Sequence, residues 1–200
     1  MIEAPGMRSL QRRDLLVLFA ALGLTPLIRP QQAQAMGGTL PALDQPAPAF
    51  DLDGVAPREG RPGGVEVAHL GLQDFSSRWL VLYFYPKDFT SGCTLEANGF
   101  KRDMDAFHPN GAEVVGVSAD DNDSHSSFCG SEGLAFPLLS DPGGAVSRRY
   151  GSWIAPFSQR HTFLIDPDGI LRARWTAVRP SGHSQEVLRE LERLQTGSIG

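Results

Sequence analysis

Residues 79–97 read Trp-Leu-Val-Leu-Tyr-Phe-Tyr-Pro-Lys-Asp-Phe-Thr-Ser-Gly-Cys-Thr-Leu-Glu-Ala, and they predict a strand, a short loop and the start of a helix. The apolar run from Trp79 to Tyr85 shows no alternation and stops at Pro86, which is typical of a central strand buried on both faces. From about Cys93 to Phe107 the apolar residues recur at helical spacing. A cysteine therefore opens a helix directly behind a buried strand.

Similar patterns continue along the chain. Residues 113–119 and 161–165 are two further apolar strands, and the Asp166-Pro167-Asp168-Gly169 turn closes the second. Residues 171–175 alternate as an antiparallel hairpin partner would. Glycine and proline predict a loop over 54–64, and the composition of 36–49 predicts a coil. Three more helices are predicted: one from Ser124 (the N-cap) to Glu132, a short one with Pro142 at its first position, and one over 184–194.

The order of these elements predicts the fold class. Strand, helix, strand, helix, helix, hairpin and helix make an α/β domain, with helices on both faces of a mixed sheet. A length of 200 residues suits one such domain with a short extension, and an apolar content of 41% is enough for one core. The formal net charge is −5. An acidic chain without a basic, aromatic-rich stripe is a poor partner for nucleic acid.

The N-terminal 35 residues resemble an export signal. Arg12-Arg13 precede an apolar run, Leu15 to Leu24, and Ala33-Gln34-Ala35 offers the small-x-small pattern of a cleavage site. The paired arginines favour the twin-arginine route, although the Sec route stays open. About ten apolar residues are too few to cross a bilayer, so no stable membrane insertion is expected. We expect a signal over 1–35, a lead-in over 36–49, a domain over 44–195, and a destination in the periplasm or thylakoid lumen.

The position of Cys93 favours a reactive thiolate. The positive end of the helix dipole and the free N–H groups of the first turn both stabilise a negative sulfur. The hydroxyl of Thr90, three residues earlier, can reach the sulfur, and Gly92 lets a reactant approach. From position alone, a buried structural cysteine is an equal alternative.

The quoted stretch also resembles a known active-site signature. Pro86-x-x-x-Thr90-x-x-Cys93 is similar to the motif of peroxiredoxins, and YFYPKDFTSGCTLEA resembles the bacterioferritin-comigratory-protein, or Q-type, subfamily. Residues 160–166 (RHTFLID) and 128–141 (FCGSEGLAFPLLSD) resemble the same subfamily, so the likeness spans roughly residues 44–195. The resemblance implies a thioredoxin fold, which agrees with the element order above.

The resemblance also implies roles for the site residues. Cys93 would be the peroxidatic cysteine, which attacks a peroxide oxygen and becomes a sulfenic acid. Thr90 would hold sulfur and peroxide, Arg160 would stabilise the thiolate and the leaving oxygen, and Pro86 would shield the sulfur from water. Glu96 would support the site from the first turn of the helix without being catalytic.

The second cysteine is less certain from sequence. Many Q-type relatives carry a resolving cysteine five residues after the first, but that position is Asn98 here. The resemblance to a subset of the subfamily implies that Cys129 resolves, by an intramolecular disulfide with Cys93. A disulfide needs Cα atoms within about 7 Å, so we expect local unwinding around both cysteines. The alternative is a core cysteine beside Phe128.

The implied activity is a monomeric thiol peroxidase that reduces hydrogen peroxide and organic hydroperoxides and is recycled by thioredoxin or a similar dithiol protein. No metal, haem or flavin is implied. A thioredoxin-like disulfide oxidoreductase would need Cys-x-x-Cys, but residue 96 is Glu. A non-enzymatic chaperone module would not need Thr90, Cys93 and Arg160 together. Two minor alternatives are a metal pair at His125 and Cys129 and a calcium loop at residues 120–123.

Overall fold

The computed structural model describes residues 33–58, 60 and 64–197. The described residues all belong to one compact unit, Gln32–Gly200. Residues 1–32, which hold most of the predicted export signal, lie outside the described residues. None of the helices in the described part is long and apolar enough to span a bilayer.

A seven-stranded mixed sheet forms the centre of the domain, as predicted. Its order is β11-β10-β5-β6-β7-β3-β4. The three central strands β5, β6 and β7 are parallel, and every other pairing is antiparallel. The strands are β3 (Asp51–Pro57), β4 (Val65–Gly71), β5 (Trp79–Phe84), β6 (Ala112–Ser118), β7 (Leu138–Ser140), β10 (His161–Ile165) and β11 (Leu171–Trp175).

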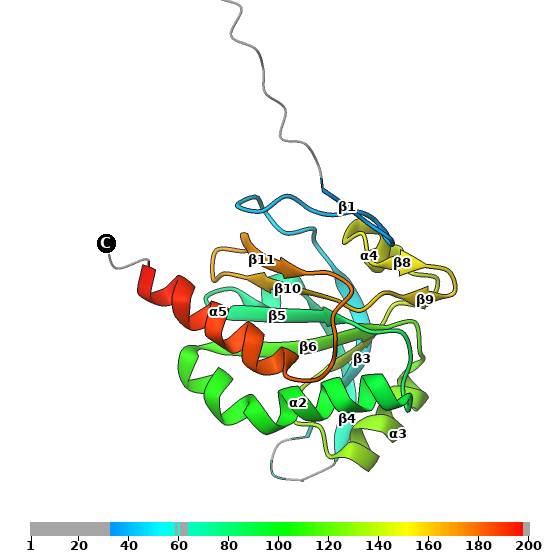
Figure 1. Ribbon diagram of the computed structural model, residues 1–200. Helices are drawn as coiled ribbons and strands as arrows, with labels where there is room; N and C mark the ends of the chain where they lie inside the picture. The colour runs from blue at the N-terminus through cyan, green and yellow to red at the C-terminus, as the bar shows by residue number, and fades with distance from the viewer. Residues whose placement is uncertain (1–32, 59, 61–63, 198–200) are drawn as a thin grey trace, which may run out of the picture. The chain divides into compact units, whose positions relative to one another are not determined.

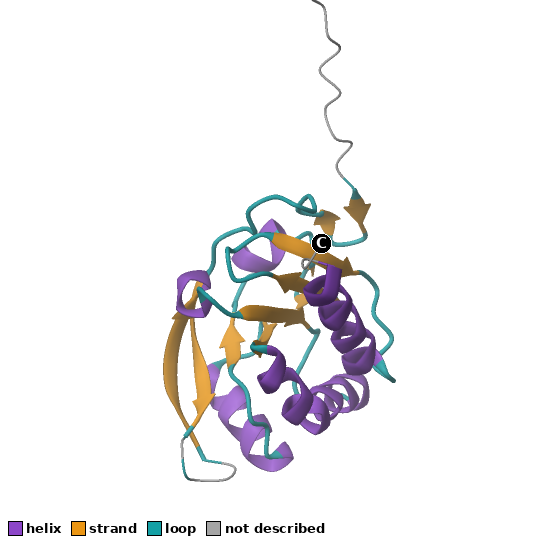
Figure 2. Cartoon of the chain, turned by 90° about the vertical axis from the view of Figure 1, so that its left-hand side faces the viewer, coloured by secondary structure: helices purple, strands orange, loops and turns teal. Residues whose placement is uncertain are grey.

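Helices cover both faces of this sheet. They are α2 (Ser91–Phe107), α3 (Asn122–Glu132), α4 (Ala145–Arg149) and α5 (His183–Gly197), with short 3₁₀ turns η1 (Leu72–Phe75) and η2 (His108–Asn110). α2, α3 and α5 pack on one face around Phe100, Phe128 and Leu191 (Figures 1 and 2). α4 and the lead-in pack on the other face through residues such as Val146 and Leu40. The predicted fold class is therefore confirmed.

The predicted loop over 54–64 was wrong at its start, because residues 51–57 form β3. Gly54 lies inside the strand, opposite Leu139 of β7 and Ala68 of β4. A Cβ at Gly54 would lie 2.3 Å from the carbonyl oxygen of Leu138, so the glycine permits close approach of two backbones and does not mark a turn. Strands β4 and β7 were not predicted either.

Two predicted helix starts were also displaced. The N-cap of α3 is Asp121, whose carboxylate accepts a hydrogen bond from the backbone N–H of Ser124, so Ser124 is not the cap. Helix α4 begins at Ala145 after Gly144, which has a positive φ, so Pro142 precedes the helix. The remaining predicted strands and helices are confirmed to within three residues at each end.

The lead-in is not wholly coil. Two short strands, β1 (Gln34–Ala35) and β2 (Gly38–Thr39), pair as a hairpin, and the N–H of Leu40 donates to the carbonyl of Ala33. A second small hairpin joins β8 (Trp153–Ile154) to β9 (Phe157–Ser158). The last three residues of the predicted signal, 33–35, thus pack with the domain.

Candidate active site

Cys93 lies in the first turn of α2, where the chain leaves the carboxyl end of β5. Its side chain is only 1% exposed. Thr90 is the N-cap, but its hydroxyl is directed at the sulfur and not at a backbone N–H of the helix. Thr90 Oγ1 lies 2.9 Å from Cys93 Sγ and 3.0 Å from the carbonyl oxygen of Lys87. The hydroxyl has one hydrogen, and an ionised sulfur is the stronger acceptor for it.

Arg160 brings a positive charge to the same sulfur from the neighbouring strand. It immediately precedes β10, whose His161 pairs with Phe84 at the end of β5. This register places Arg160 beside the loop that leads to α2. Its Nη2 donates to Cys93 Sγ over 3.3 Å. A thiolate at this position therefore has a hydroxyl donor, a guanidinium donor and a helix N-terminus around it.

Glu96 holds the other side of the guanidinium. Arg160 Nη1 donates to Glu96 Oε2 over 2.5 Å, and the Glu96 carboxyl is almost wholly buried. Its second oxygen, Oε1, has no hydrogen-bond partner among the described residues. Burial raises the pKa of Glu96 to about 7, although the charge of Arg160 and its hydrogen bond oppose the rise. Glu96 thus positions Arg160, and its described hydrogen bond is to the guanidinium and not to the sulfur.

Gly92 makes room for the arginine. A Cβ on Gly92 would lie 3.1 Å from Arg160 Nη2, the nitrogen that reaches Cys93. A side chain at position 92 would crowd the guanidinium nitrogen that donates to Cys93 Sγ. The small residue that was predicted to admit a reactant thus also admits Arg160.

A cavity of about 690 Å³ opens beside this group. Pro86 and Arg160 form part of its lining, so the cavity gives access to the guanidinium that contacts the sulfur. Its lining residues are Gln34, Ala35, Met36, Pro86, Gln159, Arg160, His161, Thr176, Ala177 and Val178.

A buried polar cluster ties the loop before Cys93 to α3. The Asp88 carboxylate accepts hydrogen bonds from Tyr85 Oη (2.8 Å) and Ser124 Oγ (2.8 Å) and lies 2.9 Å from His125 Nδ1. The backbone N–H of Asp88 donates to Asp120. Sequence reasoning missed this cluster, since Asp88 carried no signal beyond its place in the signature. His125 and Asp120 are thus engaged in hydrogen bonds with Asp88, and Asp121 caps α3 through the N–H of Ser124.

Cys129 lies on α3 in the core. Its side chain is fully buried, one helical turn after His125, and its thiol is free. Burial, together with the negative charge of Asp88, raises the pKa of Cys129 to about 12. In this conformation the Cys129 thiol is buried and protonated at neutral pH.

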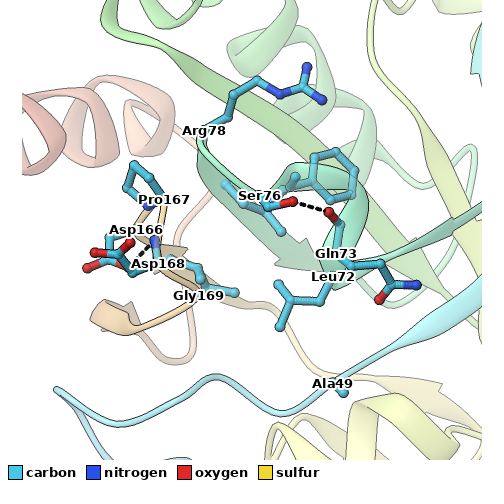
Figure 3. A pocket seen from close by; sticks show the side chains of 12 residues that line it. Ala49, Leu72, Gln73, Ser76, Arg78, Asp166, Pro167, Asp168 and Gly169 are labelled. Carbon is cyan, nitrogen blue, oxygen red and sulfur yellow. Dashed lines mark hydrogen bonds between the residues drawn. The ribbon is translucent and has the colours of Figure 1, made fainter.

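Other cavities lie elsewhere on the described surface. A second cavity of about 290 Å³ lies at the amino end of β5, between Arg78 and the Asp166–Gly169 turn (Figure 3). Because β10 runs antiparallel to β5, this cavity is at the opposite end of both strands from Arg160. Within residues 33–58, 60 and 64–197, no group of three or more His, Cys, Asp or Glu side chains could hold a metal ion.

Comparison with known proteins decides the family. The AhpC/TSA family model matches residues 43–174. The chain belongs to the AhpC/TSA family. It is 37% identical to Peroxiredoxin Bcp of Xanthomonas campestris over 159 residues, which are 75% of this chain and 94% of that protein.

Solved structures of this family agree. Xanthomonas campestris Peroxiredoxin Q superposes with a TM-score of 0.63 at 34% identity, over 72% of this chain and 90% of that chain. The structure of a bacterioferritin comigratory protein from the same organism superposes with a TM-score of 0.63 at 31% identity, over 82% of this chain and 98% of that chain. The chain is thus a peroxiredoxin of the Bcp or Q type, and the predicted resemblance is confirmed.

Replacement of Thr90 by valine tests the hydroxyl contact. Thr90→Val keeps the shape but removes the donor to Cys93 Sγ, and one lost donor of this kind costs roughly 100-fold or more in rate. We expect that loss in the stopped-flow reaction of reduced protein with hydrogen peroxide. Thr94→Val, on the same helix turn, should react like the wild type; equal rates for both variants would contradict the assignment.

Glu96 makes stability depend on pH. Because the folded carboxyl titrates near 7 and an ordinary one near 4.5, the folded state binds the proton more tightly across that window. The free energy of unfolding should therefore fall as pH rises through the window, by up to about 3 kcal/mol. Glu96→Gln should flatten this slope in urea titrations of reduced protein, whereas Glu192→Gln, exposed on α5, should not. If the free energy of unfolding of Glu96→Gln depends on pH as steeply as that of the wild type, the Glu96 carboxyl is not the cause of the slope.

Proposed function

We propose that this peroxiredoxin reduces hydroperoxides through the thiolate of Cys93. The observation that carries the proposal is the convergence of Thr90 Oγ1 and Arg160 Nη2 on one sulfur at a helix N-terminus. The thiolate attacks one peroxide oxygen; the S–O bond forms as the O–O bond breaks. The leaving oxygen takes a proton and departs as water or an alcohol, and Cys93 becomes a sulfenic acid.

Arg160 and Thr90 are the groups that stabilise charge in this step. Negative charge moves from the sulfur to the leaving oxygen, and a guanidinium already fixed by Glu96 need not reorganise to meet it. The cavity beside Arg160 gives the peroxide its approach. We assign hydrogen peroxide and organic hydroperoxides as substrates. In support, the similar Xanthomonas protein is described in terms of alkyl peroxide reduction activity.

We further propose that Cys129 resolves the sulfenic acid. Its sulfur attacks Cys93, the S–S bond forms, and the hydroxide that leaves combines with the thiol proton to give water. Serine variants of Xanthomonas campestris Peroxiredoxin Q support this, since its two substituted cysteines are as far apart in sequence as Cys93 and Cys129.

Helix α3 is suited to the unwinding that this step needs. Its sequence, Asn-Asp-Ser-His-Ser-Ser-Phe-Cys-Gly-Ser-Glu, contains four serines and a glycine, all weaker helix formers than alanine or leucine. Gly130 directly follows Cys129. The helix is therefore held in place more by the Asp88 cluster and Phe128 than by its own propensity, and its local opening costs less than global unfolding.

We propose that a dithiol protein of the thioredoxin type then reduces the disulfide. We also propose that the protein acts as a monomer, because an intramolecular disulfide needs no partner chain. A thioredoxin-like oxidoreductase is the alternative. Against it, the position three residues after Cys93 is Glu96, which is engaged with Arg160.

Cysteine variants separate these possibilities. With dithiothreitol as reductant, wild type and Cys129→Ser should both consume hydrogen peroxide, whereas Cys93→Ser should not. With thioredoxin and its reductase, Cys129→Ser should lose turnover, because no disulfide forms. Intact mass after one equivalent of peroxide should show the loss of two hydrogens in wild type. An unchanged rate in Cys93→Ser would end the proposal; normal thioredoxin turnover of Cys129→Ser would remove the resolving role.

We also propose that the chain is exported to the periplasm or thylakoid lumen. The support is the pattern within residues 1–35: Arg12-Arg13, an apolar run and the small residues Ala33 and Ala35. In a bacterial host, wild type should reach the periplasmic fraction, and replacement of both arginines by lysine should retain it in the cytoplasm if the twin-arginine route is used. A cytoplasmic wild-type protein would refute export.

A further inference from the structure

The cavity beside Arg160 is larger than hydrogen peroxide requires. At about 690 Å³ it falls in the range of pockets that hold small organic ligands. Much of its lining is apolar. Ala35 and Met36 come from the N-terminal hairpin, and Ala177 and Val178 come from the segment after β11. Pro86 comes from the loop between β5 and α2. Cys93 and Thr90 are not among the lining residues, so Arg160, whose Nη2 donates to Cys93 Sγ, connects this cavity to the sulfur.

Both apolar walls are attached to the backbone next to the catalytic arginine. On one side, the N–H of Val178 donates to the carbonyl of Arg160 over 2.9 Å. On the other side, the N–H of Trp153 donates to the carbonyl of Gly37, and Ser152 exchanges hydrogen bonds with Gln159, the residue before Arg160. The walls are therefore fixed relative to the guanidinium.

The hairpin itself is anchored in the domain. Leu40, which follows β2, is buried in the core, and Ala33 and Ala35 pack against the same cluster. A Cβ at Gly37 would lie 2.5 Å from the carbonyl oxygen of Gly151, so the turn sits directly on that backbone. The hairpin lies before residue 43, where the match to the family model begins.

Met36 is the most exposed large apolar side chain in the described part of the chain, at 84%. A long, unbranched thioether that projects at the rim of a catalytic cavity can adapt to apolar groups of various shapes. Exposure of that side chain is otherwise unfavourable, because it leaves apolar surface in water.

We propose that the hairpin residues Ala35 and Met36 determine substrate specificity by contacting the organic part of a bulky hydroperoxide while its peroxide group reaches Arg160 and Cys93. This inference rests on the proposed peroxidase function. It concerns the chain in which the bond between Ala35 and Met36, the predicted cleavage point of the export signal, is intact.

The test compares two peroxides in the full chain, with dithiothreitol as reductant. Met36→Gln keeps the length of the side chain but makes its end polar, and we expect kcat/KM for cumene hydroperoxide to fall roughly five-fold, through KM. Hydrogen peroxide should react at the wild-type rate. Met36→Leu, which restores apolar contact, should behave like the wild type with both peroxides.

Val67→Gln is the matched control, because Val67 is similarly exposed, on edge strand β4, and is not among the cavity residues. It should change neither rate. Equal values of kcat/KM for Met36→Gln and wild type with cumene hydroperoxide, or an equal loss with both peroxides, would overturn the inference. If wild type fails to reduce hydrogen peroxide, the proposed function itself fails, which is a distinct result.

Discussion

The site depends on one guanidinium. Arg160 bridges the carboxylate of Glu96 and the sulfur of Cys93, and so links the first strand of the C-terminal hairpin to the first turn of α2. A buried charge is costly unless it is paired and hydrogen-bonded. Here the Glu96 carboxylate and the Cys93 sulfur both accept hydrogen bonds from the guanidinium, so both hold it in place.

The position of that guanidinium follows from sheet register. His161 pairs with Phe84, so the residue before β10 lies beside the loop that follows β5. A slip of one residue would point the β10 side chains to the opposite faces and displace Arg160 from the sulfur. Gly92 completes the fit, because any larger side chain would meet Nη2. A 3.3 Å contact between Cys93 and Arg160, which are 67 residues apart in sequence, thus depends on the pairing of β10 with β5.

In the proposed mechanism, the two cysteines make opposite demands on the same structure. The Asp88 cluster orders the loop that presents Thr90 and Cys93, and it does so by binding the first turns of α3. The same hydrogen bonds keep Cys129 in the core, where burial keeps its thiol protonated. A tight site for the first step therefore opposes the second step. A helix of poor intrinsic propensity is a physical compromise between the two, since modest free energy releases it.

The active-site motif, strands β5, β6, β10 and β11 and the four helices could be read from sequence because each rests on local rules. An unbroken apolar run predicts a buried strand, and a small polar residue before a helix predicts its N-terminus. The errors occurred where a distant contact overrides the local rule. Gly54 reads as a turn residue but lies in a strand, because the backbone of β7 comes too close for a Cβ. The cap of α3 moved from Ser124 to Asp121, because Ser124 donates to Asp88 instead.

By itself, therefore, the sequence determined the fold class and the family, and it singled out Cys93 as the candidate reactive cysteine, because these depend on residue types at short, regular spacings. Only the tertiary structure decided what surrounds that sulfur. The pairing of Glu96 with Arg160, the contact of His125 with Asp88 and the cavity that residues 34–36 share with Pro86 and Arg160 all join segments far apart in the chain. Such contacts are set by how strands pair and helices pack, and no local pattern encodes that geometry.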